Sequence, residues 1–256
     1  MSKSLNIAEA IAAAKSAGRP AIVAFMTAGF PRRATFLETL TRIGSAADVI
    51  EIGVPFTDPM ADGMTIQRAS EAALKDGVTL AWILDELRGA AARPAAPLLL
   101  MSYLNPLLRF GFDRLPAAAR AAGVSGFIVP DLPNEEGDEF ATALKAEGLA
   151  LVQMVTPVTP RERLEALCRH ADGFVYAVTM TGITGRSVDV PDEVLSYLDA
   201  VRAASGAPVC AGFGIRNRGQ VERLAPHVDG VIVGSALVEV LERGEDPAAF
   251  LRELHL

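Results

Sequence analysis

The sequence predicts a (β/α)8 TIM barrel with an extra helix at its N-terminus. Short apolar or β-branched runs alternate with longer helical patterns rich in Ala, Leu, Glu and Arg, and eight such pairs follow one another. Most of the short runs are apolar at consecutive positions, which is typical of parallel strands buried on both faces. The 256 residues, half of them hydrophobic, suit one barrel with a large core.

The predicted strands are these apolar runs. They cover residues 21–27, 48–54, 97–103, 126–131, 150–156, 173–179, 207–213 and 230–234. A helix should follow each strand, because parallel neighbours need a crossover connection. The predicted helices cover residues 34–46, 64–88 with a break near Gly77, 113–122, 135–147, 160–170, 191–204, 218–224 and 236–254. The extra helix, residues 4–17, is expected to cross the bottom of the barrel.

A doubly wound open sheet is the main alternative to the barrel. Such a sheet normally carries a glycine-rich dinucleotide turn after its first strand. Residues 27–31 read TAGFP, which does not fit the GxGxxG pattern. The barrel is therefore favoured, and with no linker in the chain we expect a single domain over residues 1–256.

Composition argues against several classes of partner. The formal net charge is −7, and lysines and arginines are scattered, so neither nucleic acid nor a membrane surface is an expected partner. The longest apolar stretches are far shorter than the roughly 20 residues that a membrane-spanning helix needs. The first residues contain no hydrophobic signal core, so we expect a cytoplasmic protein.

The cysteines and histidines do not predict a metal site. Cys168 and Cys210 stand apart, in a helical and a strand-like stretch, and are interpreted as buried packing residues. His170 and His227 precede strands, at the end of the barrel opposite to the expected site, and His255 lies in the C-terminal tail. We therefore expect neither a bound metal nor histidine catalysis.

Glu51 is an unusual residue in the middle of the second predicted strand. Alternation places Ile50, Ile52 and Val54 toward the helices, which turns Glu51 into the barrel. Burial of a carboxyl group raises its pKa toward the range useful for proton transfer, so Glu51 is a candidate general acid and base. A structural glutamate, bound to backbone amides or to an arginine, is the alternative.

Two further carboxylates follow in residues 55–63. Two carboxylates in different surroundings can divide acid and base work between them. Asp58 reads most simply as part of a turn. Asp62 is equally compatible with a catalytic role and with capping the helix that begins near Met64.

Glycines predict an anion site at the ends of the last three strands. Residues 181–185, 212–215 and 234–236 include Gly185, Gly214, Gly234 and Ser235. Glycine lets backbone N–H groups approach an anion, and a helix N-terminus adds free donors and a favourable dipole. Barrels build phosphate sites in this region.

Four aromatic residues fall at the same rim and could line a flat apolar pocket, although each alone is better explained as a core residue: Phe25, Tyr103, Tyr176 and Phe213. The residues together predict an enzyme for a phosphorylated small molecule with an apolar part, using carboxylates and no metal or nucleotide.

The run EIGVPFTDPMADG, residues 51–63, closely resembles the signature of the tryptophan synthase alpha chain family. The resemblance continues in order through FMTAG, MSYLNP, PDLP, GITG and GFGI, which begin at residues 25, 101, 130, 182 and 212. It extends from the N-terminal helix to the last strand, and the residue 51–63 motif is the most specific part of it.

The resemblance implies retro-aldol cleavage of indole-3-glycerol phosphate to indole and glyceraldehyde 3-phosphate. It implies that Glu51 protonates the indole ring and helps to deprotonate the glycerol hydroxyl, while Asp62 acts at the indole N–H. The remaining implied roles are an indole pocket of Phe25, Tyr176 and Phe213, a closing loop with Thr184, and phosphate donors at Gly185, Gly214, Gly234 and Ser235.

The resemblance also implies a partner. Family members pair with a tryptophan synthase beta chain in an alpha2beta2 heterotetramer, and pyridoxal phosphate belongs to the beta chain, so no cofactor is expected in this chain. A stand-alone indole-3-glycerol-phosphate lyase and a non-catalytic barrel that only binds a phosphorylated ligand are the alternatives.

Overall fold

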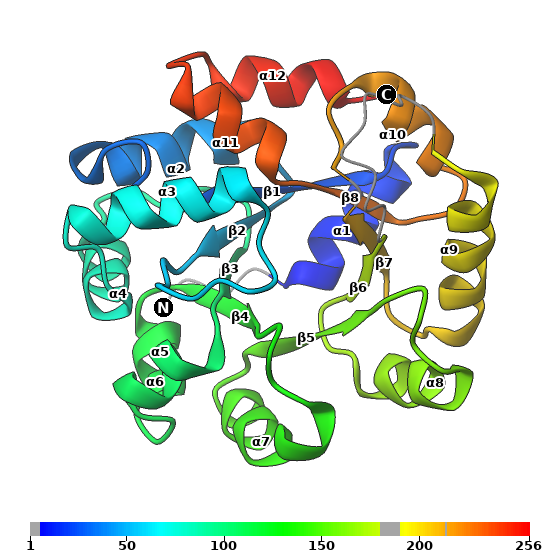
Figure 1. The fold of residues 1–256 in the computed structure, drawn as a ribbon, viewed down its shortest axis with the longest axis horizontal. Helices are drawn as coiled ribbons and strands as arrows, with labels where there is room; N and C mark the ends of the chain where they lie inside the picture. The colour runs from blue at the N-terminus through cyan, green and yellow to red at the C-terminus, as the bar shows by residue number, and fades with distance from the viewer. Residues whose placement is uncertain (1–5, 180–189, 213) are drawn as a thin grey trace.

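The computed structural model describes residues 6–179, 190–212 and 214–256, and these form the predicted closed barrel (Figure 1). Eight parallel strands pair in chain order, and β8 closes the ring against β1. The strands are β1 Ala21–Thr27, β2 Val49–Gly53, β3 Leu98–Met101, β4 Val124–Ile128, β5 Ala150–Val155, β6 Val175–Val178, β7 Val209–Gly212 and β8 Gly230–Val233.

Helices surround the barrel and connect its strands. The α-helices are α1 Ile7–Ser16, α2 Phe36–Gly44, α3 Met64–Lys75, α4 Leu80–Gly89, α5 Leu104–Phe110, α6 Leu115–Ala121, α7 Asp138–Ala146, α8 Arg161–His170, α9 Asp192–Ala204, α10 Arg218–Leu224, α11 Ser235–Glu242 and α12 Pro247–Leu254. Two short 3-10 helices, η1 Arg33–Thr35 and η2 Asn134–Glu136, precede α2 and α7.

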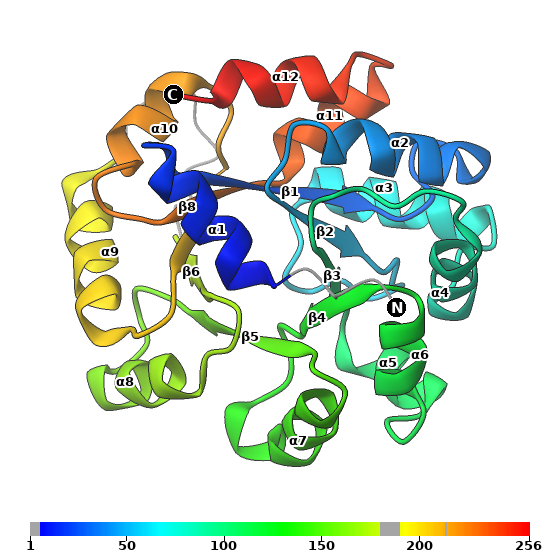
Figure 2. The ribbon, with the colours of Figure 1, turned by 180° about the vertical axis from the view of Figure 1, so that it is seen from behind.

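Apolar side chains form two cores on opposite faces of the strands. The outer core, between strands and helices, includes Ile50 and Ile52, whereas Val49 and Leu99 belong to the inner core. Alternation along β2 therefore has the predicted sense. Ile7 and Ile11 of α1 join the inner core, so the extra helix covers the bottom opening of the barrel (Figure 2).

The element predictions are right in order, and most bounds differ from the structure by only one to three residues. α5 was not predicted, because it has only seven residues, begins directly after the end of the predicted third strand and contains Pro106. The stretch predicted as one C-terminal helix is two, α11 and α12, which are separated at Gly244 with a φ of 71°. β4 begins at Val124, two residues before the predicted start.

The cysteine prediction is confirmed: Cys168 and Cys210 are buried free thiols. Among the described residues, no group of three or more His, Cys, Asp or Glu side chains could hold a metal ion. No helix in the described ranges is long and apolar enough to cross a membrane.

Candidate active site

Glu51 lies inside the barrel at the centre of β2, with Phe25 of β1 and Leu99 of β3 as its register neighbours. Its side chain is fully buried, and neither carboxyl oxygen has a hydrogen-bond partner among the described residues. Desolvation disfavours the charged form and raises the pKa of Glu51 to about 8. Among the described residues, no backbone amide and no arginine binds the Glu51 carboxyl group, so the alternative of a structural glutamate does not hold.

Asp62 lies at the end of the loop between β2 and α3. The N-cap of α3 is Gly63, and no side chain caps this helix, so the capping interpretation of Asp62 is wrong. Burial raises the pKa of the Asp62 carboxyl to about 6, and a hydrogen bond from Tyr103 opposes that rise. The two carboxyl groups are thus held in different protonation states near neutral pH, Glu51 neutral and Asp62 mostly ionised.

Tyr103 fixes the loop that carries Asp62. Its hydroxyl accepts a hydrogen bond of 2.9 Å from the backbone N–H of Ala61 and donates to the Asp62 carboxylate. Its ring stacks on Phe56, with ring centroids 5.2 Å apart. Because Tyr103 follows β3 and the loop follows β2, neighbouring strands position both groups at the same rim.

Further hydrogen bonds order the same loop. The backbone N–H of Met60 donates to the carbonyl of Asp58, which confirms the predicted turn there. The side-chain amide of Gln67, on α3, donates to the carbonyl oxygen of Asp62 at 2.8 Å. The first turn of α3 therefore holds the backbone of Asp62, while its side chain remains available to the pocket.

A small pocket adjoins Asp62 at the carboxyl ends of β1, β2 and β3. It is lined by Phe25, Gly53, Val54, Asp62, Ile66, Ser70, Met101, Ser102, Tyr103 and Pro130. Ile66, Ser70, Met101 and Ser102 were not predicted. The four-residue spacing of Ile66 and Ser70, which places both on one face of α3, is the signal that could have found these two.

Glycines make room for the aromatic side chains of the site. A methyl group on Gly53 would come within 2.6 Å of the ring of Phe25, and one on Gly212 within 2.7 Å of the ring of Tyr176. Burial raises the pKa of Tyr176 well above its usual value, and the charge of nearby Glu51 adds to the rise. Phe25, the register neighbour of Glu51, and Tyr176 thus lie close to the Glu51 carboxyl group.

The predicted phosphate rim is described in part. Gly214 has a φ of 65° and open space beside its Cα, and Gly234 and Ser235 begin α11. A methyl group on Gly234 would lie 3.9 Å from Cδ1 of Ile66 and 4.0 Å from Cβ of Phe25, so this rim adjoins the pocket near Asp62. Thr184, Gly185 and Phe213 lie outside the described residues.

A larger groove, of about 960 Å³, lies between α7 and α8 over the outer face of β5. None of the residues predicted for the site lines it. The candidate site is the rim formed by the loops after β1, β2, β3, β7 and β8. The size of a groove is therefore no guide to the site in this barrel.

Comparison with known proteins decides the family. The family model of the tryptophan synthase alpha chain matches residues 11–255. The chain belongs to this family. The resemblance seen in the sequence is confirmed, and with it the assignment of the chain as a lyase of tryptophan biosynthesis.

Individual relatives agree with the family match. The chain is 46% identical over 246 residues to the tryptophan synthase alpha chain of Desulfovibrio desulfuricans, covering 95% of this chain and 96% of the relative. The alpha chain of Chloroflexus aurantiacus is 43% identical, with 97% of each chain covered.

Solved structures show the same fold. Tryptophan synthase from M. tuberculosis in its aminoacrylate-bound form superposes with a TM-score of 0.87 at 33% identity, covering 97% of both chains. The alpha subunit from Legionella pneumophila str. Paris gives a TM-score of 0.87 at 31% identity, covering 98% of this chain and 97% of that one.

Proposed function

We propose that this chain cleaves indole-3-glycerol phosphate to indole and glyceraldehyde 3-phosphate, with Glu51 and Asp62 as its catalytic residues. The observation that carries the proposal is the pair of carboxyl groups whose pKa values are raised to about 8 and about 6. At neutral pH one is protonated and can act as an acid, while the other is largely ionised and can stabilise positive charge.

The reaction needs two proton transfers, and Glu51 takes part in both. Glu51 donates its proton to the ring carbon that bears the glycerol chain, and the ring becomes a cation whose charge is shared with the nitrogen, next to the Asp62 carboxylate. The Glu51 carboxylate then takes the proton of the hydroxyl on the adjacent side-chain carbon. The O–H electron pair forms the aldehyde, the C–C bond breaks, and its electrons neutralise the ring. Glu51 ends protonated, ready for the next cycle.

Substrate binding divides along the rim. We assign Phe25 and Tyr103, which line the pocket, and Tyr176, which lies near Glu51, to the indole ring. The backbone donors at Gly214, Gly234 and Ser235 are assigned to the phosphate. Phe213 beside the indole, Thr184 in the closing loop and Gly185 at the phosphate remain predictions from the resemblance.

The proposed chemistry uses no cofactor in this chain, because the protonated ring itself accepts the electrons of the broken bond. The proposed partner is a tryptophan synthase beta chain, which holds pyridoxal phosphate, in an alpha2beta2 heterotetramer. Met60, Met64 and Leu108 are large apolar side chains exposed in the segments after β2 and β3, and they would suit such an interface. The free thiols of Cys168 and Cys210 fit a reducing cytoplasm.

The test is indole release from indole-3-glycerol phosphate by wild type and Glu51→Gln, each with and without a beta chain. We expect wild type to release indole faster with the beta chain and folded Glu51→Gln to be nearly inactive. Equal rates with and without the beta chain would favour a stand-alone lyase. No indole under any condition would leave a phosphate-binding barrel without this reaction.

A further inference from the structure

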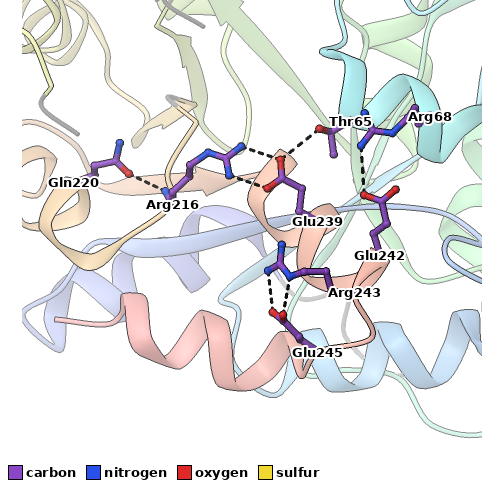
Figure 3. A network of polar contacts seen from close by, with 8 residues as sticks. All are labelled: Thr65, Arg68, Arg216, Gln220, Glu239, Glu242, Arg243 and Glu245. Atoms are coloured by element: carbon purple, nitrogen blue, oxygen red, sulfur yellow. Dashed lines mark hydrogen bonds and ion pairs between the residues drawn. The ribbon is translucent and has the colours of Figure 1, made fainter. Parts of the chain in front are cut away.

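A polar network on the barrel rim joins α3, the loop after β7, α10 and α11 (Figure 3). We call Thr65, Arg216, Gln220 and Glu239 the rim network. Thr65 is on α3, Arg216 follows Gly214 by two residues, Gln220 is on α10, and Glu239 is on α11 one turn after Ser235. The four side chains connect segments that are distant in sequence.

On one side, the network holds the loop after β7. Both guanidinium nitrogens of Arg216 donate to the carboxylate of Glu239, each at 2.8 Å. The backbone N–H of Arg216 donates at 2.8 Å to Oε1 of Gln220, a side chain that is only 7% exposed. The loop that bears Gly214 is therefore fixed through both the backbone and the side chain of Arg216.

On the other side, the network reaches α3. The hydroxyl of Thr65 donates to Oε1 of Glu239 at 3.4 Å, and Arg68 pairs with Glu242 at 3.3 Å one turn further along both helices. Glu239 thus accepts hydrogen bonds from α3 and from the loop after β7 at the same time. The hydrogen bond from Arg216 lowers the pKa of Glu239, which keeps this bridging group ionised.

Three consecutive residues of α3 face three parts of the site. Thr65 contacts Glu239, Ile66 lines the pocket beside Gly234, and Gln67 holds the carbonyl oxygen of Asp62. A shift of this helical turn would therefore move the groups at the phosphate rim and the backbone of Asp62 together, because a single rigid turn carries all three contacts.

The contribution of the network to stability can be separated from its effect on the site. The Arg216 and Glu239 side chains are 55% and 25% exposed, so solvent screening limits what this pair contributes to the free energy of unfolding. The nearby pair of Arg218 and Glu222 has similar chemistry, at 2.9 Å, but both residues are on α10. That pair is a matched control, since it links no two segments of the site.

We propose that Glu239 is a positioning residue that couples the phosphate rim to the loop carrying Asp62. The proposal rests on the roles proposed above for Asp62 and for Gly214, Gly234 and Ser235. A phosphate group bound by the loop after β7 and the start of α11 would hold these two segments in place. Because Glu239 bonds to Arg216 and to Thr65, the position of Glu239 and that of the first turn of α3 would be held as well. The phosphate of the substrate thereby helps to set the position of Asp62 beside the indole.

The test is a mutant cycle measured on the full chain assembled with a tryptophan synthase beta chain. Thr65→Val and Arg216→Gln each remove one partner of Glu239, and no hydrogen bond joins those two side chains among the described residues. If Glu239 couples them, their effects on kcat/KM for indole-3-glycerol phosphate should deviate from additivity by about threefold or more. In a Glu239→Gln background the same two changes should be additive.

Controls separate coupling from unfolding. Thr65→Ser keeps the hydroxyl and should retain the coupling, and Glu222→Gln should leave kcat, KM and the thermal midpoint unchanged. Glu239→Gln should lower kcat more than it lowers the affinity for glycerol 3-phosphate, with a thermal midpoint close to that of Glu222→Gln. Additive effects in the wild-type background, or kinetics of Glu239→Gln equal to those of Glu222→Gln, would overturn the proposal.

The proposed function fails in a different way. It fails when Glu51→Gln or Asp62→Asn retains wild-type kcat. If only the coupling proposal fails, Glu51→Gln and Asp62→Asn are still inactive, and the effects of Thr65→Val and Arg216→Gln on kcat/KM are additive.

Discussion

The interior of the barrel and its bottom treat carboxyl groups in opposite ways. At the bottom, the Asp48 carboxylate accepts hydrogen bonds from the two terminal guanidinium nitrogens of Arg19, at 2.7 and 2.9 Å, and from the backbone N–H of Ile22. Asp229 pairs with Lys15 at 2.6 Å and accepts from the N–H of Val209 at 2.9 Å. In the middle of the same barrel, Glu51 has no partner among the described residues.

The contrast separates carboxylates that hold the fold together from carboxyl groups kept for chemistry. Asp48 and Asp229 precede β2 and β8 and tie those strands to the end of α1 and the segment after it, so their charges are satisfied. Burying Glu51 without a partner costs free energy once it ionises, and that cost raises its pKa. The interior thus gives up stability to keep a proton donor, whereas the carboxylates at the bottom stabilise the fold.

The largest effect should come from Glu51→Gln. The amide has a similar shape but no transferable proton, so we expect kcat for indole release to fall by about 10²–10⁴-fold while the circular dichroism spectrum stays that of the wild type. Retention of more than a tenth of wild-type kcat would contradict the contrast between the interior and the bottom.

At the bottom, Asp229→Asn should do the opposite. It weakens the pairing with Lys15 and the bond from Val209, so we expect the free energy of unfolding to fall by about 2 kcal/mol. Per folded molecule, kcat should stay at the wild-type value. Chemical denaturation followed by assay at low denaturant checks both numbers, and a loss of kcat without a loss of stability would refute the division of roles.

The pH dependence of stability should sharpen the same contrast. The pKa of Glu51 is about 8 in the fold and near 4.5 in the unfolded chain, so above pH 4.5 the folded state retains a proton that the unfolded state has lost. Its contribution to stability is therefore lost as the pH rises toward 8. Glu51→Gln should gain on the wild type by a few kcal/mol between pH 5 and pH 9. A constant difference in denaturation midpoints would contradict the raised pKa.

The activity profile follows from the two pKa values. kcat/KM should be bell-shaped, with an acid limb near pH 6 where Asp62 is protonated and a basic limb near pH 8 where Glu51 is ionised. Asp62→Asn should remove the acid limb from whatever activity remains. An acid limb unchanged in that variant would assign it to another group.

The smallest effect is expected from Tyr103→Phe. The phenol hydrogen bond opposes the rise in the pKa of Asp62, so its loss should move the acid limb to higher pH. The N–H of Ala61 also loses its acceptor, and since each hydrogen bond contributes about 1 kcal/mol or less, we expect kcat to fall by roughly fivefold to tenfold. A shift of the limb to lower pH would be the wrong sign for this arrangement.

Local patterns in the sequence determined the barrel and the direction of Glu51. The two-residue period of a strand needs no knowledge of distant contacts, so the aliphatic residues Ile50 and Ile52 were enough to turn Glu51 inward. The ends of strands likewise indicated Asp62, Tyr103, Gly214 and Gly234, because parallel strands bring all their carboxyl ends to one rim.

Only the tertiary structure decided what those residues contact. The sequence left Glu51 open to an arginine partner and Asp62 open to a capping role, and packing against other strands settled both. It also placed Ile66 and Ser70 in the pocket and joined Thr65 to Glu239, which is 174 residues away. Periodicity is a property of neighbours along the chain, whereas a hydrogen-bond partner or a buried pKa depends on groups that only the closed barrel brings together.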